Sequence, residues 1–342
     1  MKNFSKLSLF FSCFLILLAT SSPCLAKISI AVLPFENISA DPKFDWLKQG
    51  MAETLSTDLK CISEFQLIER VQVLKAISEI AFGATGFVDE VSAQKAGKII
   101  GAQQILVGGF QIQEENIRVT ARIIEATTGK VLNTFKVDGL IADLFSLQDE
   151  IVKKILEQFD ILVTDEEKTS IARKPTANLE AYRYYIKGLE LVDSGSVDKA
   201  VEYYKKSIEI DPQFTTPYRQ VITILLTLDE VKEAEKLAKD FLNAASTIKD
   251  DKILGDAYLC LVLVLTKQKK WKEAEKYYNE GVKKKKLVKD LHGLLEIYEV
   301  GTSLYYAWMT MRPNMHAVDE STKLLLETEK LQKLLGVYKS PF

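Results

Sequence analysis

Residue types that could do catalytic chemistry are sparse in this chain of 342 residues, and none is grouped at a catalytic spacing. The two histidines, His292 and His316, have no second histidine, cysteine or paired carboxylate at ligand spacing. The sequence also lacks the nucleophile motif GxSxG, the zinc motif HExxH, the phosphate-binding motif GxxxxGK[ST] and a GxGxxG motif after a strand. These observations predict that the chain is not an enzyme and that it binds no cofactor and no metal.

A run of four lysines, Lys283 to Lys286, offers a different chemistry, the docking of acidic groups. It could bind an acidic partner or lipid headgroups, but cations at a helix C-terminus are also typical of a solvated face. We expect the solvated face. A cluster of large side chains between residues 305 and 311 is likewise expected to belong to the hydrophobic core and not to a ligand-binding site. Its members are Tyr305, Tyr306, Trp308, Met309 and Met311.

Small residues, tyrosines and a proline recur between Ala181 and Pro212 at the spacing of a helical hairpin. Gly188 and Ala200 allow two antiparallel helices to approach closely, Gly195 ends the first helix, and Pro212 stops the second. This spacing is similar to that of tetratricopeptide repeats, which have a period of about 34 residues. The sequence therefore predicts a binding scaffold at this hairpin.

The pattern continues after the first hairpin. A second repeat is counted from Thr215 without a gap, and a third begins near Gly255 after six extra residues that lengthen the preceding helix or its loop. Two more helices between Asp290 and Leu335 are too irregular to be a repeat. They are expected to cap the stack, because an end repeat otherwise leaves an apolar face in water.

The first helices of such repeats line a concave groove. Six groove residues are the predicted partner-binding residues: Tyr182, Tyr185, Leu189, Arg219, Thr223 and Leu259. A surface that is aromatic and aliphatic with one arginine suits an apolar or extended peptide of a protein partner. The alternative, that some of these side chains pack against a neighbouring domain, stays open.

The part of the chain before the repeats predicts a separate α/β domain. Nearly unbroken apolar residues predict a buried strand at Lys27–Phe35, and a helix with an apolar stripe follows it. After a second strand at Phe65–Glu69, three strands joined by short hairpins and the helix Leu144–Phe159 complete the domain. The predicted fold class is α+β: an N-terminal α/β sandwich with a mixed sheet, then an all-α superhelix of tetratricopeptide repeats.

Four segments of this domain carry a family resemblance. They read IAVLPFENISADPKFDWLKQGMAETLSTDL, FQLIERVQVLKAISEI, AGKIIGAQQILVGGF and VTARIIEATTGKVL. In that order they resemble the conserved blocks of the TolB amino-terminal and CsgG-like (FlgO-like) superfamily of bacterial envelope proteins, from Lys27 to about Ile161. The resemblance implies a soluble, self-associating envelope domain. It implies no channel, because the hairpin loops here are only a few residues long and the exposed face of the strands carries charge. The lipid-facing band of a barrel is therefore missing.

The first 26 residues predict a cleaved export signal, with a basic start at Lys2 and Lys6, an apolar run and small residues up to Ala26. A permanent membrane anchor and a lipid on Cys24 are the alternatives. The predicted domains are a signal peptide (1–26), the α/β domain (27–162), a linker with a short capped helix (163–178), and the repeat domain with its capping helices (179–342). The predicted location is the periplasm, with association to the outer membrane left open.

Charge and cysteine usage narrow the partners further. The formal charge is −2, and removal of the signal brings it to about −4, so the chain has no general attraction for nucleic acid or anionic lipid. After cleavage only Cys61 and Cys260 remain, and we expect both to be free, packed residues.

The sequence thus predicts a scaffold that binds protein partners in cell-envelope assembly or regulation, with self-association through the α/β domain left open. The alternative is an accessory subunit of an outer-membrane secretion or pore complex.

Overall fold

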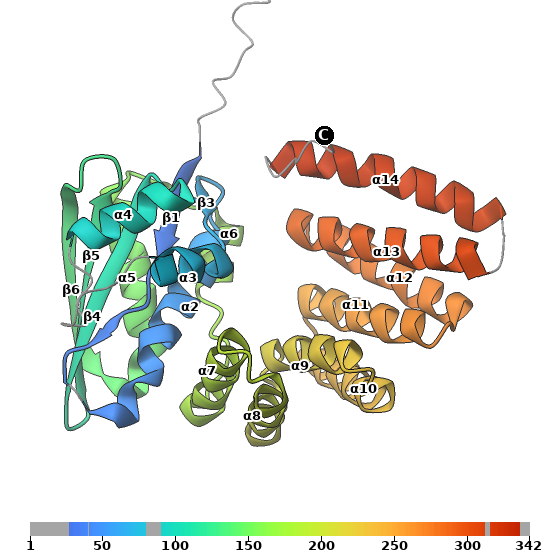
Figure 1. Cartoon of the computed structure of the whole chain (residues 1–342), viewed down its shortest axis with the longest axis horizontal. Helices are drawn as coiled ribbons and strands as arrows, with labels where there is room; N and C mark the ends of the chain where they lie inside the picture. Colours follow the sequence, from blue (N-terminus) through green and yellow to red (C-terminus); the bar gives the residue numbers. More distant parts are fainter. Residues whose placement is uncertain (1–26, 40, 80–89, 312–314, 336–342) are drawn as a thin grey trace, which may run out of the picture. The chain divides into compact units, whose positions relative to one another are not determined.

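We describe a computed structural model of the chain over residues 27–39, 41–79, 90–311 and 315–335. The predicted signal peptide and the predicted loop Phe82–Gly86 lie outside these residues. The chain divides into two compact units, Met1–Arg173 and Lys174–Phe342, and each is described by itself. Figure 1 labels the helices and strands in chain order.

The first unit is built on a mixed sheet. Within the described residues its strands are β1 (Ile28–Val32), β2 (Glu36–Asn37), β3 (Phe65–Leu67), β4 (Gln104–Gln113), β5 (Asn116–Glu125) and β6 (Val131–Leu140). The strand order is β3-β1-β4-β5-β6, and β2 also pairs with β4. β1 runs parallel to β3 and β4, whereas β4, β5 and β6 form an antiparallel meander (Figure 1).

Helices cover this sheet in two groups. α2 (Trp46–Lys60) packs against α5 (Leu144–Gln158), and these two helices contact β1, β3 and β6. α3 (Arg70–Glu79) packs against α4 (Glu90–Ile100), and this pair contacts β1, β4 and β5. A Cβ atom added at Gly97 would lie 2.4 Å from Ile105, so α4 meets β4 at the distance that only glycine allows. The core under α3 and α4 includes Val73, Ala76, Ala93, Ala96, Ile105 and Val107.

Within the residues that the structure describes, three short helices complete the unit. They are η1 (Pro42–Phe44), η2 (Ile141–Asp143) and α6 (Asp165–Ile171). The predicted capping box of α6 is present, because Thr164 and Glu167 exchange side-chain to backbone hydrogen bonds. Glu167 also accepts hydrogen bonds from the backbone N–H and the hydroxyl of Ser63, at 2.8 and 2.9 Å, so the cap fixes α6 to the turn after α2.

The second unit is a stack of helices. In chain order they are α7 (Leu179–Asp193), α8 (Val197–Ile210), α9 (Thr216–Thr227), α10 (Val231–Ile248), α11 (Asp251–Lys267), α12 (Trp271–Leu287), α13 (Leu291–Met311) and α14 (Met315–Leu335). Each helix packs against the next one in the chain (Figure 1). The extra residues before the third repeat lengthen α10, which has 18 residues where α8 has 14.

The small residues of the first hairpin have the predicted roles. A Cβ atom added at Gly188 would lie 2.5 Å from the ring of Tyr204, so α7 and α8 touch through that glycine. Gly195 has a φ of 77° in the turn between them, a left-handed conformation that favours glycine. Ala200 is fully buried, and α8 ends before Pro212.

The structure confirms the predicted fold class, an α/β unit with a mixed sheet followed by a helical unit. The short strand β2 was not predicted. It forms where the chain leaving β1 runs beside Gly109 and Phe110 of β4. Among the helices of the described ranges, we find none with the length and apolar character needed to cross a bilayer.

Candidate functional site

The predicted groove residues on α7 and α11 are not an open surface. Tyr182, Tyr185, Leu189 and Leu259 are only 1 to 3% exposed. The ring of Phe214, from the turn before α9, lies 5.3 Å from that of Tyr185 and 6.2 Å from that of Tyr182. We therefore correct the expectation that these four side chains are exposed: they are core residues, and Phe214 packs against the rings of Tyr182 and Tyr185.

The other two predicted residues lie on α9. The guanidinium of Arg219 forms an ion pair with the carboxylate of Glu296 on α13. The side chain of Arg219 is 42% exposed. Thr223 is exposed, and its hydroxyl donates to the carbonyl of Arg219 at 2.9 Å. Arg219 thus links α9 to α13, and a half-exposed pair of this kind stabilises by about 0–1 kcal/mol.

The lysine run is not the uniformly solvated face that we expected. Lys285 is 1% exposed, and its Nζ lies 2.5 Å from Oδ1 of Asp256 and 2.8 Å from Oδ2 of Asp290. Added Cβ atoms at Gly255 and Gly293 would each approach this side chain to 2.7 Å, so the two glycines form its slot. Burial acts to raise the pKa of Asp290, but Lys285 and the N–H of Gly293 outweigh it and hold that pKa below its usual value.

A second polar cluster joins the last three helices. The Nε2 atom of His316 lies 2.6 Å from Oε1 of Glu275, and the hydroxyl of Tyr305 donates to the same oxygen at 2.9 Å. The hydrogen bond to Glu275 raises the pKa of His316 above its usual value. Tyr305 and Trp308 are buried as predicted, but Tyr306 and Met311 are 60% and 57% exposed and are not core.

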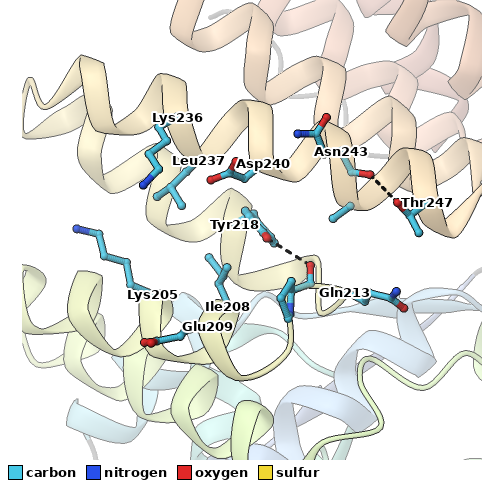
Figure 2. Close-up of a pocket in the computed structure, with 12 residues that line it drawn as sticks. Lys205, Ile208, Glu209, Gln213, Tyr218, Lys236, Leu237, Asp240, Asn243 and Thr247 are labelled. Atoms are coloured by element: carbon cyan, nitrogen blue, oxygen red, sulfur yellow. Dashed lines mark hydrogen bonds between the residues drawn. The ribbon is translucent and has the colours of Figure 1, made fainter.

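A surface hollow of about 620 Å³ lies between α8 and α10 (Figure 2). It is lined by α8, the turn before α9, the first turn of α9, and α10. Its apolar members are Ile208, Pro212, Tyr218, Leu237 and Ala244, and its polar members are Lys205, Glu209, Gln213, Lys236, Asp240, Asn243 and Thr247.

Tyr218 forms a rigid part of the floor of this hollow. Its ring is 2% exposed and stacks on Phe241 at 5.3 Å, while its hydroxyl donates to the carbonyl of Pro212 at 3.3 Å (Figure 2). Burial, with smaller contributions from Asp240 and Asp211, raises the pKa of Tyr218 to about 12. The tyrosine therefore stays neutral and keeps the α8–α9 turn in place beneath the hollow.

Charges of both signs surround the apolar members. Lys205 and Lys236 lie with Glu209 and Asp240 around the side chains of Ile208 and Leu237 (Figure 2). Lys205 is also paired with Glu233 of α10 at 2.5 Å, which bridges the two helices. An apolar centre within a polar rim is the composition that protein interfaces use. The hollow can thus accept a segment with apolar side chains and polar flanks.

The sequence reasoning missed the hollow because it considered only the first helix of each repeat. The lining comes mainly from the second helices, α8 and α10. A signal was present: Ile208 and Leu237 are apolar positions on these helices outside the small-residue pattern of the repeat.

The comparisons with known proteins identify the repeat. A model of the tetratricopeptide repeat matches residues 181–214. A curated relative from Rhizobium meliloti (strain 1021), named "Putative adenylate cyclase 3", is 26% identical over 258 residues. This match covers 73% of the present chain and 42% of the relative, so the chain spans less than half of that protein's length.

The similarities to solved structures are remote. The lipoprotein GNA1162 from Neisseria meningitidis is 18% identical with a TM-score of 0.30, covering 40% of this chain and 99% of that one. TolB from Acinetobacter baumannii is 13% identical with a TM-score of 0.29, covering 42% and 30%. The C-terminal domain of LpoB from Salmonella enterica is 12% identical with a TM-score of 0.25, covering 36% and 91%.

These findings contradict one expectation and confirm another. The prediction that the chain is not an enzyme is contradicted by the relative from Rhizobium meliloti, which bears the name of an enzyme. The prediction of a tetratricopeptide repeat is confirmed. The resemblance of the first unit to TolB and CsgG-like proteins stays a prediction.

Proposed function

We propose that the chain is a scaffold that binds a protein partner through its repeat unit, and that the hollow between α8 and α10 receives an extended segment of that partner. One observation carries this proposal: the hollow lies between the second helix of the matched tetratricopeptide repeat and α10, and its apolar centre has a charged rim. The arrangement of Tyr218, Phe241 and Pro212 supports it further, because a floor fixed in advance lowers the ordering cost of binding.

Photocrosslinking in cells tests this assignment. A photoreactive amino acid replaces Gln213 or Asn243, two exposed residues of the hollow, and the crosslinked proteins are identified by mass spectrometry. The control is the same replacement at Thr223, which is also exposed but lies on α9 outside the hollow. We expect one protein to be captured at Gln213 and Asn243 and not at Thr223. Equal capture of that protein at Thr223 would move the site to the other side of α9.

A pair of substitutions then measures the contribution of the hollow. Leu237→Glu places a charge in its apolar centre, whereas Leu226→Glu places the same charge at a half-buried leucine of α9 outside it. Interface anchors contribute about 2 kcal/mol or more, so Leu237→Glu should weaken binding of the captured protein by about thirtyfold. Leu226→Glu should leave the affinity nearly unchanged, and an equal loss in both variants would argue against the hollow.

The proposal includes a location in the cell envelope. Its support is the basic start, apolar run and small residues of 1–26 together with the resemblance of the first unit to envelope proteins. Sequencing the amino terminus of protein purified from cells should give a start at Lys27 in the periplasmic fraction. A start at Cys24 carrying lipid would instead favour the accessory subunit of an outer-membrane complex.

A second candidate function comes from the name of the curated relative, an adenylate cyclase. Because the chain spans 42% of that protein, its activity is a proposal here. Purified protein is incubated with ATP and Mg²⁺ or Mn²⁺, and cyclic AMP is measured by mass spectrometry. Production that scales with protein concentration would support a cyclase, whereas the background rate at every concentration would count against it.

A further inference from the structure

Strand β6 leaves one edge of the sheet of the first unit open. β6 pairs with β5 along Val131–Leu140, and it is the last strand of the order β3-β1-β4-β5-β6 (Figure 1). None of the described residues forms a strand on its other side. An edge of this length presents a row of backbone N–H and C=O groups that can pair with another strand.

Opposite charges stand close together in the middle of this edge. Lys136 and Asp138 are two residues apart, so they lie on the same face of the sheet, and both are exposed. Asp138 accepts two hydrogen bonds from the guanidinium of Arg118 on β5, at 2.6 and 3.1 Å. The buried residues between and beside them, Phe135 and Val137, point to the other face, toward the core.

These charges are complementary to those of an identical strand. When a strand pairs antiparallel with its own copy around a two-fold axis, the residue at the centre faces itself. With Val137 at the centre, Lys136 faces the partner's Asp138, and Asp138 faces the partner's Lys136. Directly opposite charges stabilise such a pair, whereas like charges destabilise it.

The neighbouring registers are excluded by the same charges. Because opposite residues must lie on the same face, the centre can move only to another single residue of β6. Centring on Lys136 places two lysines face to face, and centring on Asp138 does the same with two aspartates. A lone lysine in an edge strand usually prevents pairing. The aspartate two residues away offsets this effect in the register centred on Val137, because only there does each lysine face an aspartate.

We propose that β6 binds β6 of a second copy of this chain, antiparallel and centred on Val137, with the two Lys136–Asp138 pairs setting the register. Each sheet then continues into the other. Within one copy, Thr120 lies opposite Lys136 and Arg118 lies opposite Asp138. Across the four neighbouring strands of the dimer, the side chains on this face therefore follow in the order Thr120, Lys136, the partner's Asp138 and the partner's Arg118. This inference is independent of the binding role of the repeat unit.

Sedimentation velocity of protein purified from cells, over a wide concentration series, tests the association. We expect a monomer–dimer equilibrium for the wild type that weakens with added salt. Lys136→Glu changes both pairs from attraction to repulsion and should raise the dissociation constant at least about tenfold. Lys153→Glu, on an exposed residue of α5, is the charge-matched control and should dissociate as the wild type does. A wild-type monomer at every concentration overturns the proposal, and so does a dimer that Lys136→Glu leaves unchanged.

Disulfide trapping tests the register without touching either charge. In the proposed pairing Thr134 faces the partner's Leu140, and both residues are exposed. Opposite Cα atoms in antiparallel strands lie about 4.5–5.5 Å apart, within the range of about 4.4–6.8 Å that a disulfide spans. Thr134→Cys/Leu140→Cys should form a covalent dimer on mild oxidation, in a Cys61→Ser background because the other described cysteine, Cys260, is buried. Thr134→Cys alone should not, and an equal yield from the single variant overturns the register.

Discussion

Replacing Lys285 by methionine removes a buried cation while keeping the length and apolar stem of the side chain. In the wild type the ammonium group lies between Asp256 and Asp290, at 2.5 and 2.8 Å, and is shielded from water. In Lys285→Met both carboxylates lose this partner. Asp290 is the more consequential of the two, because its side chain is only 12% exposed whereas that of Asp256 is 27% exposed.

The size of the effect follows from burial. Removing one partner of a buried ion pair typically costs about 3–5 kcal/mol, because the remaining charge stays out of water. Asp290 keeps the hydrogen bond from the N–H of Gly293 at 3.0 Å, and Asp256 keeps partial access to solvent, so we place the loss at the lower end, about 3 kcal/mol. The neighbouring Lys284 is the matched control. Its pair with Asp251 at 2.6 Å has both side chains more than a quarter exposed, so Lys284→Met should cost about 1 kcal/mol or less.

The assay is denaturant unfolding followed by far-UV circular dichroism, repeated between neutral and acidic pH. The pKa of Asp290 is lowered in the folded protein, so its contribution to stability is present above the unfolded-state pKa and is lost as pH falls through the folded-state pKa. Lys285→Met loses the part of this contribution that comes from Lys285. The gap between wild type and variant should therefore be largest near neutral pH and should close in acid, where Asp290 becomes protonated.

A rescue variant separates charge from packing. Lys285→Met/Asp256→Asn/Asp290→Asn removes all three charges, and asparagine at 290 can still cap α13 through Gly293. Replacing a whole buried charge cluster is often neutral, so the triple variant should recover most of the lost stability. Equal stabilities of Lys285→Met and Lys284→Met, or a loss that does not change with pH, would refute the account of Lys285 as a buried charge.

Three further changes test other contacts. Asp58 is buried on α2, and this burial, with Asp149 nearby, raises its pKa to about 8. The free energy of unfolding should therefore fall by about 1.4 kcal/mol per pH unit as the pH rises from the usual pKa of an aspartate toward 8. Unfolding of Asp58→Asn over this range should lack that slope. Glu275 raises the pKa of His316, so α14 gains stability that is present below the unfolded-state pKa of the histidine and is lost as the pH rises through its folded-state pKa. His316→Gln should therefore flatten the pH dependence of the protection of α14 amides against hydrogen exchange. Gly188→Ala should lower the free energy of unfolding by about 1–3 kcal/mol, measured in denaturant, because the new methyl group meets the ring of Tyr204 at 2.5 Å.

The sequence predicted the fold well where a pattern is repeated locally. Apolar runs, hairpin turns and the spacing of Gly188, Gly195 and Ala200 depend on near neighbours in the chain, and the structure places those elements where the patterns did. The capping box of Thr164 and Glu167 is also local and was found. The strand β2 was not predicted, because it forms only through pairing with β4, which is distant in the sequence.

The candidate site was predicted less well because exposure depends on residues outside the repeat pattern. The spacing assigned Tyr182 and Tyr185 to an open groove, yet Phe214, a turn residue that the pattern does not specify, packs against both rings. Lys285 shows the opposite error, since a lysine in a charged run looks solvated until two glycines and two carboxylates on other helices form its slot. In an array of helical repeats, the side chains at positions that the repeat pattern does not specify determine which surfaces stay exposed. For this chain they leave open the hollow between α8 and α10, which makes it the first surface on which to seek a partner.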